Sequence, residues 1–76
     1  MTLQVTTVDA RGLSCPMPIV KTAQAIRSMP SGALLELLAT DPGSVKDVEA
    51  WSKTTGNELV DQSVDGGIYR FVVRRK

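Results

Sequence analysis

The run ALLELLA, residues 33–39, decides the fold, because its composition suits either a helix or a strand. Leucine and glutamate favour helix by intrinsic propensity. The run is nevertheless short, and it lies between two turn signals, PSG at residues 30–32 and TDPGS at residues 40–44. A short apolar run bounded by turns is typical of a strand. The sequence therefore predicts a strand over residues 33–39 that is buried on both sides or nearly so.

An amphipathic helix is predicted before this strand, from Pro16 to about Met29. Apolar side chains recur with helical spacing along one face, and polar side chains occupy the other. The apolar face contains Ile19, Val20, Ala23, Ile26 and Met29. Pro30 and Gly32 then stop the helix, since proline cannot continue a helix and glycine suits a turn.

A second helix is predicted after the strand. Its start lies in residues 40–44, where two signals overlap: an Asp-Pro pair, and Ser44 three residues before the acidic Asp47. The helix runs to about Thr55, and Gly56 is its predicted C-terminal cap. The side chains expected to face inward are Val45, Val48 and Trp51.

The two ends of the chain are predicted to contribute the other strands. TLQVTTV, residues 2–8, alternates as a strand does, and residues 9–14 form a loop. Residues 57–64 and 68–75 are strand-like and flank Asp65-Gly66-Gly67. That tripeptide is a hairpin signal, because its residues accept the positive φ angles of tight turns. The order of elements is therefore βαβαββ.

This order predicts an α+β fold, built as a two-layer α/β sandwich. Two right-handed strand-helix-strand crossovers place both helices on one face of a four-stranded mixed sheet. The 76 residues suit a single domain, residues 1–76, with a small core. The other face of the sheet is expected to be more exposed than usual, which makes it a candidate docking surface.

The composition excludes several classes of protein. Hydrophobic residues make up 42% and charged residues 22%, as in ordinary globular proteins, and no apolar run approaches the roughly 20 residues of a membrane span. The first ten residues show neither a basic n-region nor an apolar h-region, so we expect no secretory signal and a cytoplasmic location. With one cysteine and no histidine, we expect neither an internal disulfide nor a metal site.

Charge does not point to a nucleic-acid partner. The net charge is +1, from nine basic and eight acidic side chains, so we do not expect direct nucleic-acid binding by bulk electrostatics. The basic residues at the C-terminal end are Arg70, Arg74, Arg75 and Lys76. This cluster either steers an acidic partner or simply forms the solvated end of the last strand.

The single cysteine lies in GLSCPMPIVK, residues 12–21, between a serine and two prolines. Two prolines this close fit a helix only in its first turn, where the missing N–H groups have no helical partner. A residue before proline avoids helical backbone angles. Cys15 is therefore predicted as the N-cap and Pro16 as the first helical residue, unless the regular helix begins at Pro18.

A cysteine at the amino end of a helix lies near unpaired N–H groups and the positive end of the helix dipole. We therefore expect a stabilised thiolate on Cys15, facing the amides of Met17 and Ile19. Arg11 is a candidate for a further positive charge. The alternative is a small buried hydrophobe, the commonest fate of a free cysteine. A loop-to-helix junction lies at the surface, which favours the reactive role.

The other residues of the chain limit what a reactive Cys15 does. Cysteine proteases and amidases commonly need a histidine base, and thioredoxin-type cycles need a second thiol, and the chain has neither. One activated thiol suits sulfur transfer, in which the thiolate accepts a sulfane sulfur as a persulfide and a partner's thiol later removes it. A redox or regulatory module that forms a mixed disulfide at Cys15 stays open as the alternative.

DARGLSCPMP, residues 9–18, resembles the D-x-x-G-x-x-C-P-x-P signature of the TusA/SirA family of sulfur-carrier proteins. The similarity continues through LLELLATDPGSVKDVEAW and ELVDQSVDGGIYRFVVRRK, and so covers almost the whole chain. The resemblance implies a βαβαββ sandwich and a sulfurtransferase that carries a persulfide on Cys15. Gly12, Pro16 and Pro18 match the loop glycine and the two prolines of the motif.

The resemblance also implies partners and a chemistry without a separate cofactor. A donor similar to a cysteine desulfurase or a rhodanese loads the cysteine, and a DsrE-like acceptor unloads it. The covalent persulfide is the only intermediate that the family requires. The relay then serves transfer-RNA thiolation, cofactor sulfur supply or sulfur oxidation. Asp9 and Asp41 match acidic positions that we expect to form turns and caps.

Overall fold

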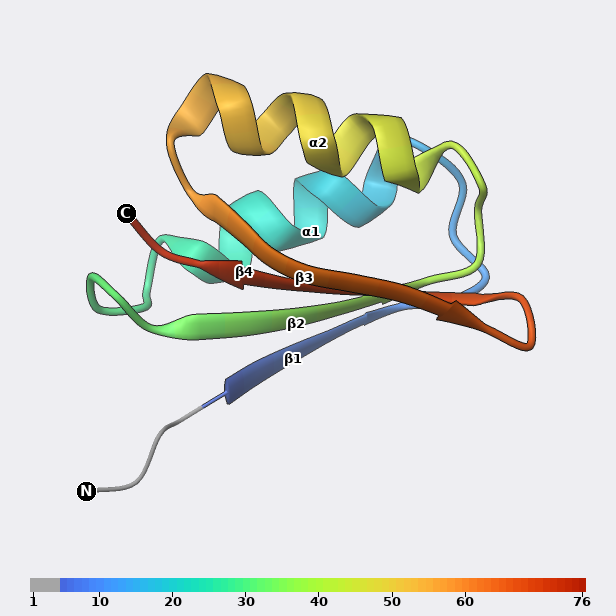
Figure 1. Ribbon diagram of the computed structural model, residues 1–76, viewed down its shortest axis with the longest axis horizontal. Coiled ribbons are helices and arrows are strands. Elements are labelled where there is room, and N and C mark those ends of the chain that lie inside the picture. The colour runs from blue at the N-terminus through green and yellow to red at the C-terminus, as the bar shows by residue number, and fades with distance from the viewer. Residues whose placement is uncertain (1–4) are drawn as a thin grey trace.

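The computed structural model describes residues 5–76 and confirms the predicted βαβαββ order (Figure 1). The elements are β1 (Val5–Ala10), α1 (Met17–Ile26), β2 (Leu34–Ala39), α2 (Ser44–Thr55), β3 (Glu58–Asp65) and β4 (Ile68–Arg74). Residues 2–4 of the predicted first strand lie outside the described residues. Neither α1 nor α2, the helices of the described range, is long and apolar enough to cross a membrane.

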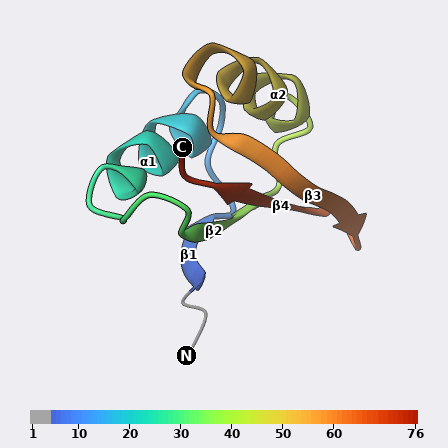
Figure 2. The same cartoon turned by 60° about the vertical axis from the view of Figure 1, so that its left-hand side comes forward.

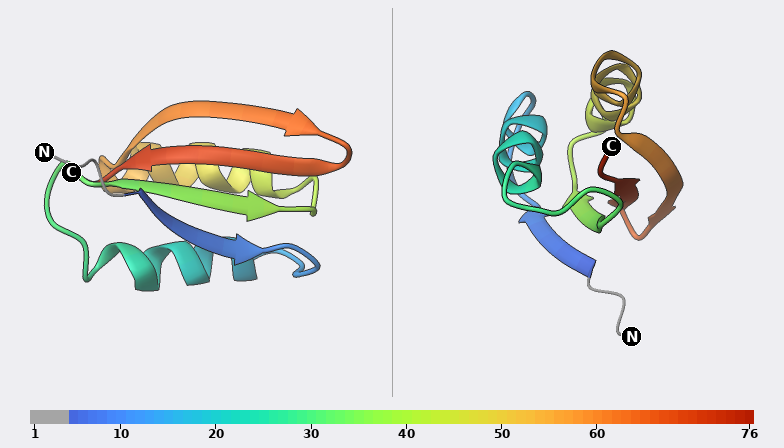
Figure 3. Two further views of the ribbon diagram at one scale, coloured as in Figure 1. Left: turned by 90° about the horizontal axis from the view of Figure 1, so that it is seen from below. Right: turned by 90° about the vertical axis from the view of Figure 1, so that its left-hand side faces the viewer.

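The four strands form one mixed sheet in the order β1-β2-β4-β3 (Figure 3). β1 pairs in parallel with β2, whereas β4 pairs antiparallel with both β2 and β3. Both helices lie on the same face of the sheet, as the views from the side and from below show (Figures 1 and 3). The predicted α+β two-layer sandwich is therefore confirmed.

The run that decided the fold is the strand β2, which lies between β1 and β4. Burial along it alternates with the period of two that a strand imposes. The fully buried side chains are Leu35, Leu37 and Ala39, and the half-buried ones on the opposite face are Leu34, Glu36 and Leu38. Pairing on both edges satisfies the backbone and overrides the helix propensity of leucine and glutamate.

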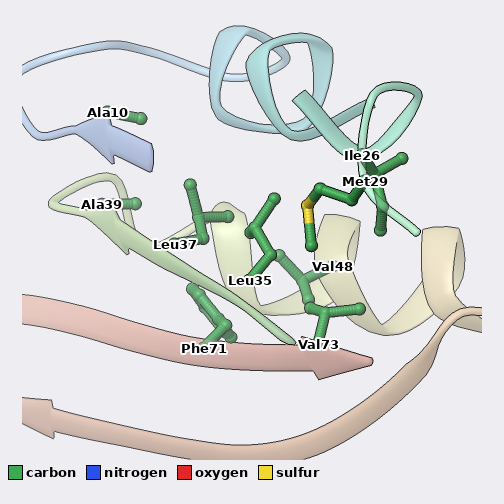
Figure 4. Packing of buried hydrophobic residues seen from close by; sticks show 9 residues of the cluster. All are labelled: Ala10, Ile26, Met29, Leu35, Leu37, Ala39, Val48, Phe71 and Val73. Carbon is green, nitrogen blue, oxygen red and sulfur yellow. The ribbon is translucent and has the colours of Figure 1, made fainter. Parts of the chain in front are cut away.

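The core lies between the helices and the sheet (Figure 4). Its buried members are Ala10, Ile26, Met29, Leu35, Leu37, Ala39, Val48, Phe71 and Val73. Val45 and Trp51 are partly buried and pack against this cluster, so the predicted inward face of α2 is confirmed. The predicted hairpin is also confirmed, because Gly66 and Gly67 form its turn with φ angles of 57° and 80°.

The predicted inward face of α1 is correct except at Val20, which is 37% exposed. The side chain buried in its place is Thr22, which lies one helical turn after the buried Pro18. The Thr22 hydroxyl donates to the Pro18 carbonyl oxygen at 2.9 Å. The polar group of the threonine is thereby satisfied inside the core, and the methyl group packs like that of valine.

Two predicted element boundaries are wrong by more than one residue. β1 continues to Ala10 because that residue still pairs with Ala39 of β2. α1 ends at Ile26, and residues 27–29 form a turn in which the Met29 amide donates to the Ile26 carbonyl. The predicted start of α2 within residues 40–44 is confirmed, with Gly43 as the N-cap and Ser44 as the first helical residue. The predicted C-terminal cap of α2 is confirmed, since Gly56 has a φ of 82° and donates its amide to Ser52.

The basic C-terminal end is engaged within the molecule. The Arg75 guanidinium donates from one nitrogen to the carbonyl oxygens of Ile26, Arg27 and Met29, and so caps the C-terminal end of α1. Arg74 pairs with Glu58 at 2.8 Å, and Arg70 pairs with Glu36 and more distantly with Asp61. These contacts favour the structural interpretation of the cluster over the steering of an acidic partner.

Candidate functional site

Cys15 lies at the end of the molecule where both helices begin. Because β1 and β2 are parallel neighbours, their carboxyl ends meet at one edge of the sheet. The loop from β1 to α1 and the loop from β2 to α2 therefore meet there, at the right-hand end of the molecule in Figure 1. Figure 2 shows the two helices side by side over the sheet. The topology thus brings residues 11–16 beside residues 40–44.

Three hydrogen bonds hold the loop that carries the cysteine. Gly12 has a φ of 81°, and its amide donates to the Thr40 hydroxyl at 2.9 Å. The Leu13 amide donates to the Ala10 carbonyl at 3.2 Å. The Cys15 amide donates to Oδ2 of Asp41 at 2.7 Å. Gly12 supplies a left-handed turn that other residues resist, and two of the three bonds reach the loop that leads into α2.

The start of α1 differs from the prediction by one residue. Pro16 is the N-cap, so Cys15 lies just before the cap rather than at it, and the Cys15–Pro16 peptide bond is cis. Met17 is the first helical residue, and the buried Pro18 follows it. The prediction that both prolines belong to the helix start is confirmed, while the prediction of Cys15 as the N-cap is wrong.

This helix start offers the sulfur few hydrogen-bond donors. Pro16 and Pro18 have no N–H group, and the Met17 amide donates to the Ser14 carbonyl at 3.0 Å. None of the described residues accepts the Ile19 amide, which is therefore the one free donor of the first turn. Most of the N–H groups that were expected to stabilise a thiolate on Cys15 are thus missing or already hydrogen-bonded within the fold.

The sulfur itself is half-buried against the start of α2. Gly43 has no side chain, and a Cβ atom placed there would lie 3.2 Å from the Cys15 Sγ, closer than ordinary van der Waals contact. Asp41 lies beside the same glycine, since its Oδ1 accepts the Gly43 amide at 3.0 Å. The thiol therefore rests on the backbone of the N-cap of α2, next to a carboxylate.

The carboxylates around Cys15 oppose its ionisation. The Asp47 carboxylate, then burial, then Asp41 raise the pKa of the Cys15 thiol to about 12. A thiolate would be repelled by the two negative charges, whereas the neutral thiol is not. The prediction of a stabilised thiolate is therefore wrong for the isolated chain, because the tertiary fold places acidic side chains where the helix dipole alone would favour an anion.

Arg11, the predicted source of positive charge, is bound to another residue. Its Nε donates to Oδ1 of Asp9 and its Nη2 donates to Oδ2, both at 2.9 Å. Hydrogen bonds from Arg11 lower the pKa of Asp9 to about 2. Asp9 also accepts the Arg11 amide, which confirms its expected role in a turn. A direct effect of Arg11 on sulfur transfer stays a prediction.

Sequence reasoning missed two residues of this site. Asp41 was expected to form a turn, which its bond to the Gly43 amide confirms, but not to hold the Cys15 amide. Asp47 was read only as part of a helix-start signal. Asp47 follows Gly43 by four residues, so the two lie on the same face of the helix. This spacing points to the cysteine only once the sulfur is known to lie against Gly43.

The comparison with known families agrees with the motif around Cys15. A family model described as sulfurtransferase TusA matches residues 6–75. The chain belongs to the TusA family. The sulfur carrier protein TusA of Allochromatium vinosum is 46% identical to it over 68 residues, which cover 90% of each chain. The sulfur carrier protein TusA of Pseudomonas fluorescens is 41% identical over 69 residues, which cover 91% of this chain and 83% of the relative.

A solved structure shows the same fold. The crystal structure of a SirA-like protein from Desulfitobacterium hafniense superposes with a TM-score of 0.80, and the match covers 93% of this chain and 96% of that one at 19% identity. As a member of the TusA family, the chain is a sulfur carrier of the sulfurtransferase type. A carrier requires a protein that donates sulfur and another that accepts it, so this role implies at least two partners.

Proposed function

We propose that this TusA-family chain carries sulfur as a persulfide on Cys15. The observation that supports this proposal best is the position of the only cysteine of the chain, half-buried in a braced loop where both helices begin. The sequence provides no second thiol to resolve a disulfide and no histidine to activate a hydrolytic nucleophile. A sulfur atom that is loaded by one protein and unloaded by another needs neither.

The proposed reaction is an exchange between two sulfur atoms. The Cys15 thiolate attacks the outer sulfur of a donor persulfide, so that a new S–S bond forms at Sγ. The donor's own S–S bond breaks, and its cysteine leaves as a thiolate. Unloading is the same step with the acceptor's thiolate as the nucleophile. No net oxidation or reduction occurs, because one sulfane sulfur moves between thiols.

The other predicted site residues act on the position of Cys15 in this proposal. Gly12 turns the loop, and its amide binds the Thr40 hydroxyl. Pro16 and Pro18 lie at the start of α1, directly after the cysteine. Pro18 is buried, so it anchors the start of the helix in the core. Arg11 contributes at most through Asp9, to which its guanidinium is bound.

For the partners, we propose a cysteine desulfurase or rhodanese-like donor and a DsrE-like acceptor. The persulfide needs no separate cofactor, and we expect the relay to work in the cytoplasm, where reducing conditions keep a lone thiol free. The alternative is a redox or regulatory module that acts through a mixed disulfide at Cys15, and an oxidant would then give a sulfenic acid or an intermolecular disulfide in preference to a persulfide.

Mass spectrometry tests the proposal. The purified chain is incubated with a protein persulfide donor, and we expect it to gain the mass of one sulfur atom on the peptide that contains Cys15. A thiol reductant should remove this mass. Cys15→Ser is the matched control, since it keeps the size of the side chain and should gain nothing. No added sulfur on Cys15 at any pH at which the chain is folded would contradict the proposal.

A further inference from the structure

The two carboxylates that face Cys15, those of Asp41 and Asp47, differ in their hydrogen-bond and ion-pair partners. Asp41 has both oxygens occupied, one by the Cys15 amide at 2.7 Å and the other by the Gly43 amide at 3.0 Å. Asp47 is half-buried, and no cation pairs with it among residues 5–76. The acidic members of the ion pairs in that range are Asp9, Glu36, Glu58 and Asp61. Asp47 is thus available to the sulfur.

Helix geometry directs the Asp47 side chain toward Cys15. The Gly43 carbonyl accepts the Asp47 amide at 3.3 Å, so the two residues are one turn apart on one face of α2. Helical side chains lean toward the N-terminus of their helix. Asp47 therefore covers the position of Gly43, where the sulfur lies. In agreement with this placement, Asp47 supplies the largest single cause of the raised pKa of Cys15.

We propose that Asp47 is a positioning residue that keeps the empty Cys15 thiol protonated until a docked partner brings a cationic side chain to Asp47. This inference rests on the proposed function and adds the regulation of the same site. The charged groups that face the sulfur are Asp41 from the loop before α2 and Asp47 from α2 itself. On the α1 side, Arg11 and Lys21 act on Asp9 instead.

The consequence is a carrier that reacts little on its own. With the pKa of the thiol raised to about 12, the thiolate is a small minority at neutral pH. A cation beside Asp47 removes the repulsion, the thiol proton leaves to water, and the thiolate attacks the outer sulfur of the donor's persulfide. The Sγ–S bond forms as the donor's S–S bond breaks, and the donor thiolate leaves. Electrons are conserved in this step.

The pH dependence of Cys15 alkylation by iodoacetamide tests the role of Asp47 without a partner. We expect the wild-type midpoint to lie well above that of an ordinary thiol. Asp47→Asn keeps the shape of the side chain but removes the charge, and should lower the midpoint by at least about one pH unit, which is about a tenfold faster reaction at pH 8. Asp47→Lys places a cation at the site and should lower it further. Asp47→Glu restores the charge and should restore most of the shift.

Glu49→Gln is the matched control, because Glu49 is an exposed acid of α2 and its loss changes the net charge equally. We expect its midpoint to equal that of the wild type. Equal midpoints for the wild type and both Asp47→Asn and Asp47→Lys would overturn the inference, as would a wild-type midpoint near that of a free thiol. In either case, sulfur loading of Cys15 tests the proposed function separately, because the cysteine can accept sulfur even if Asp47 does not control its protonation.

Discussion

The backbone amide of Cys15 donates a 2.7 Å hydrogen bond to Oδ2 of Asp41, a residue 26 positions later in the chain. The other oxygen of this carboxylate accepts the amide of Gly43. One side chain thus joins the loop that presents the thiol to the loop that starts α2. The two bonds, that of Cys15 first, hold the pKa of Asp41 below its usual range. Asp41 therefore fixes the position of the cysteine loop and adds to the negative charge beside the sulfur.

Asp41→Ala should destabilise the fold. The substitution leaves two amides without their acceptor, which typically costs about 1–3 kcal/mol. We expect a loss of this size in the free energy of unfolding, measured with urea. Glu49→Ala, a change at an exposed acid of α2, serves as the control and should stay within about 0.5 kcal/mol of the wild type. Equal losses in the two variants would contradict the bridging role of Asp41.

The thiol of Cys15 should make stability fall at alkaline pH. The folded chain holds the thiol proton up to a pKa of about 12, whereas an unfolded chain releases it near the ordinary cysteine pKa of 9.0. The contribution of the protonated thiol is therefore fully present below the unfolded pKa and is lost as pH rises between the two values. Urea unfolding at a series of pH values in this window should show a steeper decline for the wild type than for Cys15→Ser. Parallel curves would mean that the thiol titrates alike in both states.

Arg11→Gln should show that Arg11 acts on the carboxyl of Asp9 and not on the thiol of Cys15. Hydrogen bonds from Arg11 lower the pKa of Asp9 to about 2, so their loss should return the Asp9 carboxyl toward its ordinary pKa. The alkylation midpoint of Cys15 should not change, because the guanidinium lies on Asp9. Carboxyl titration by NMR measures the first quantity and the iodoacetamide profile the second. A shift of the Cys15 midpoint would instead assign Arg11 to the sulfur, as the sequence first suggested.

Arg75→Ala should cost more stability than Arg74→Ala, although the two residues are neighbours. Arg75 donates to three carbonyl oxygens at the end of α1, whereas Arg74 makes one exposed ion pair with Glu58. Lost charged hydrogen bonds to partly buried carbonyls cost about 1–3 kcal/mol, and an exposed pair is worth less than about 1 kcal/mol. Thermal or urea unfolding of both variants measures the difference. Equal losses would show that Arg75 does not cap α1.

Much of the fold was predictable because its signals are local. The glycines and prolines that bound ALLELLA identified a strand, and Gly66-Gly67 identified the hairpin. The errors lie at element ends, where distant residues decide. β1 gains two residues because β2 offers them pairing partners, and α1 ends early where the distant Arg75 caps its last carbonyls. Thr22 replaces Val20 in the core because the helix is anchored at Pro18.

By itself, the sequence placed the only cysteine of the chain beside the start of a helix. A lone cysteine before two closely spaced prolines has to stand at a helix start, because proline tolerates no other place in a helix. The charge state of its sulfur atom was decided only by the tertiary structure. Parallel pairing of β1 with β2 brings the start of α2 against the cysteine loop, and the carboxylates of Asp41 and Asp47 come with it. Electrostatic effects act through space, so a pattern of neighbours along the chain could not reveal them.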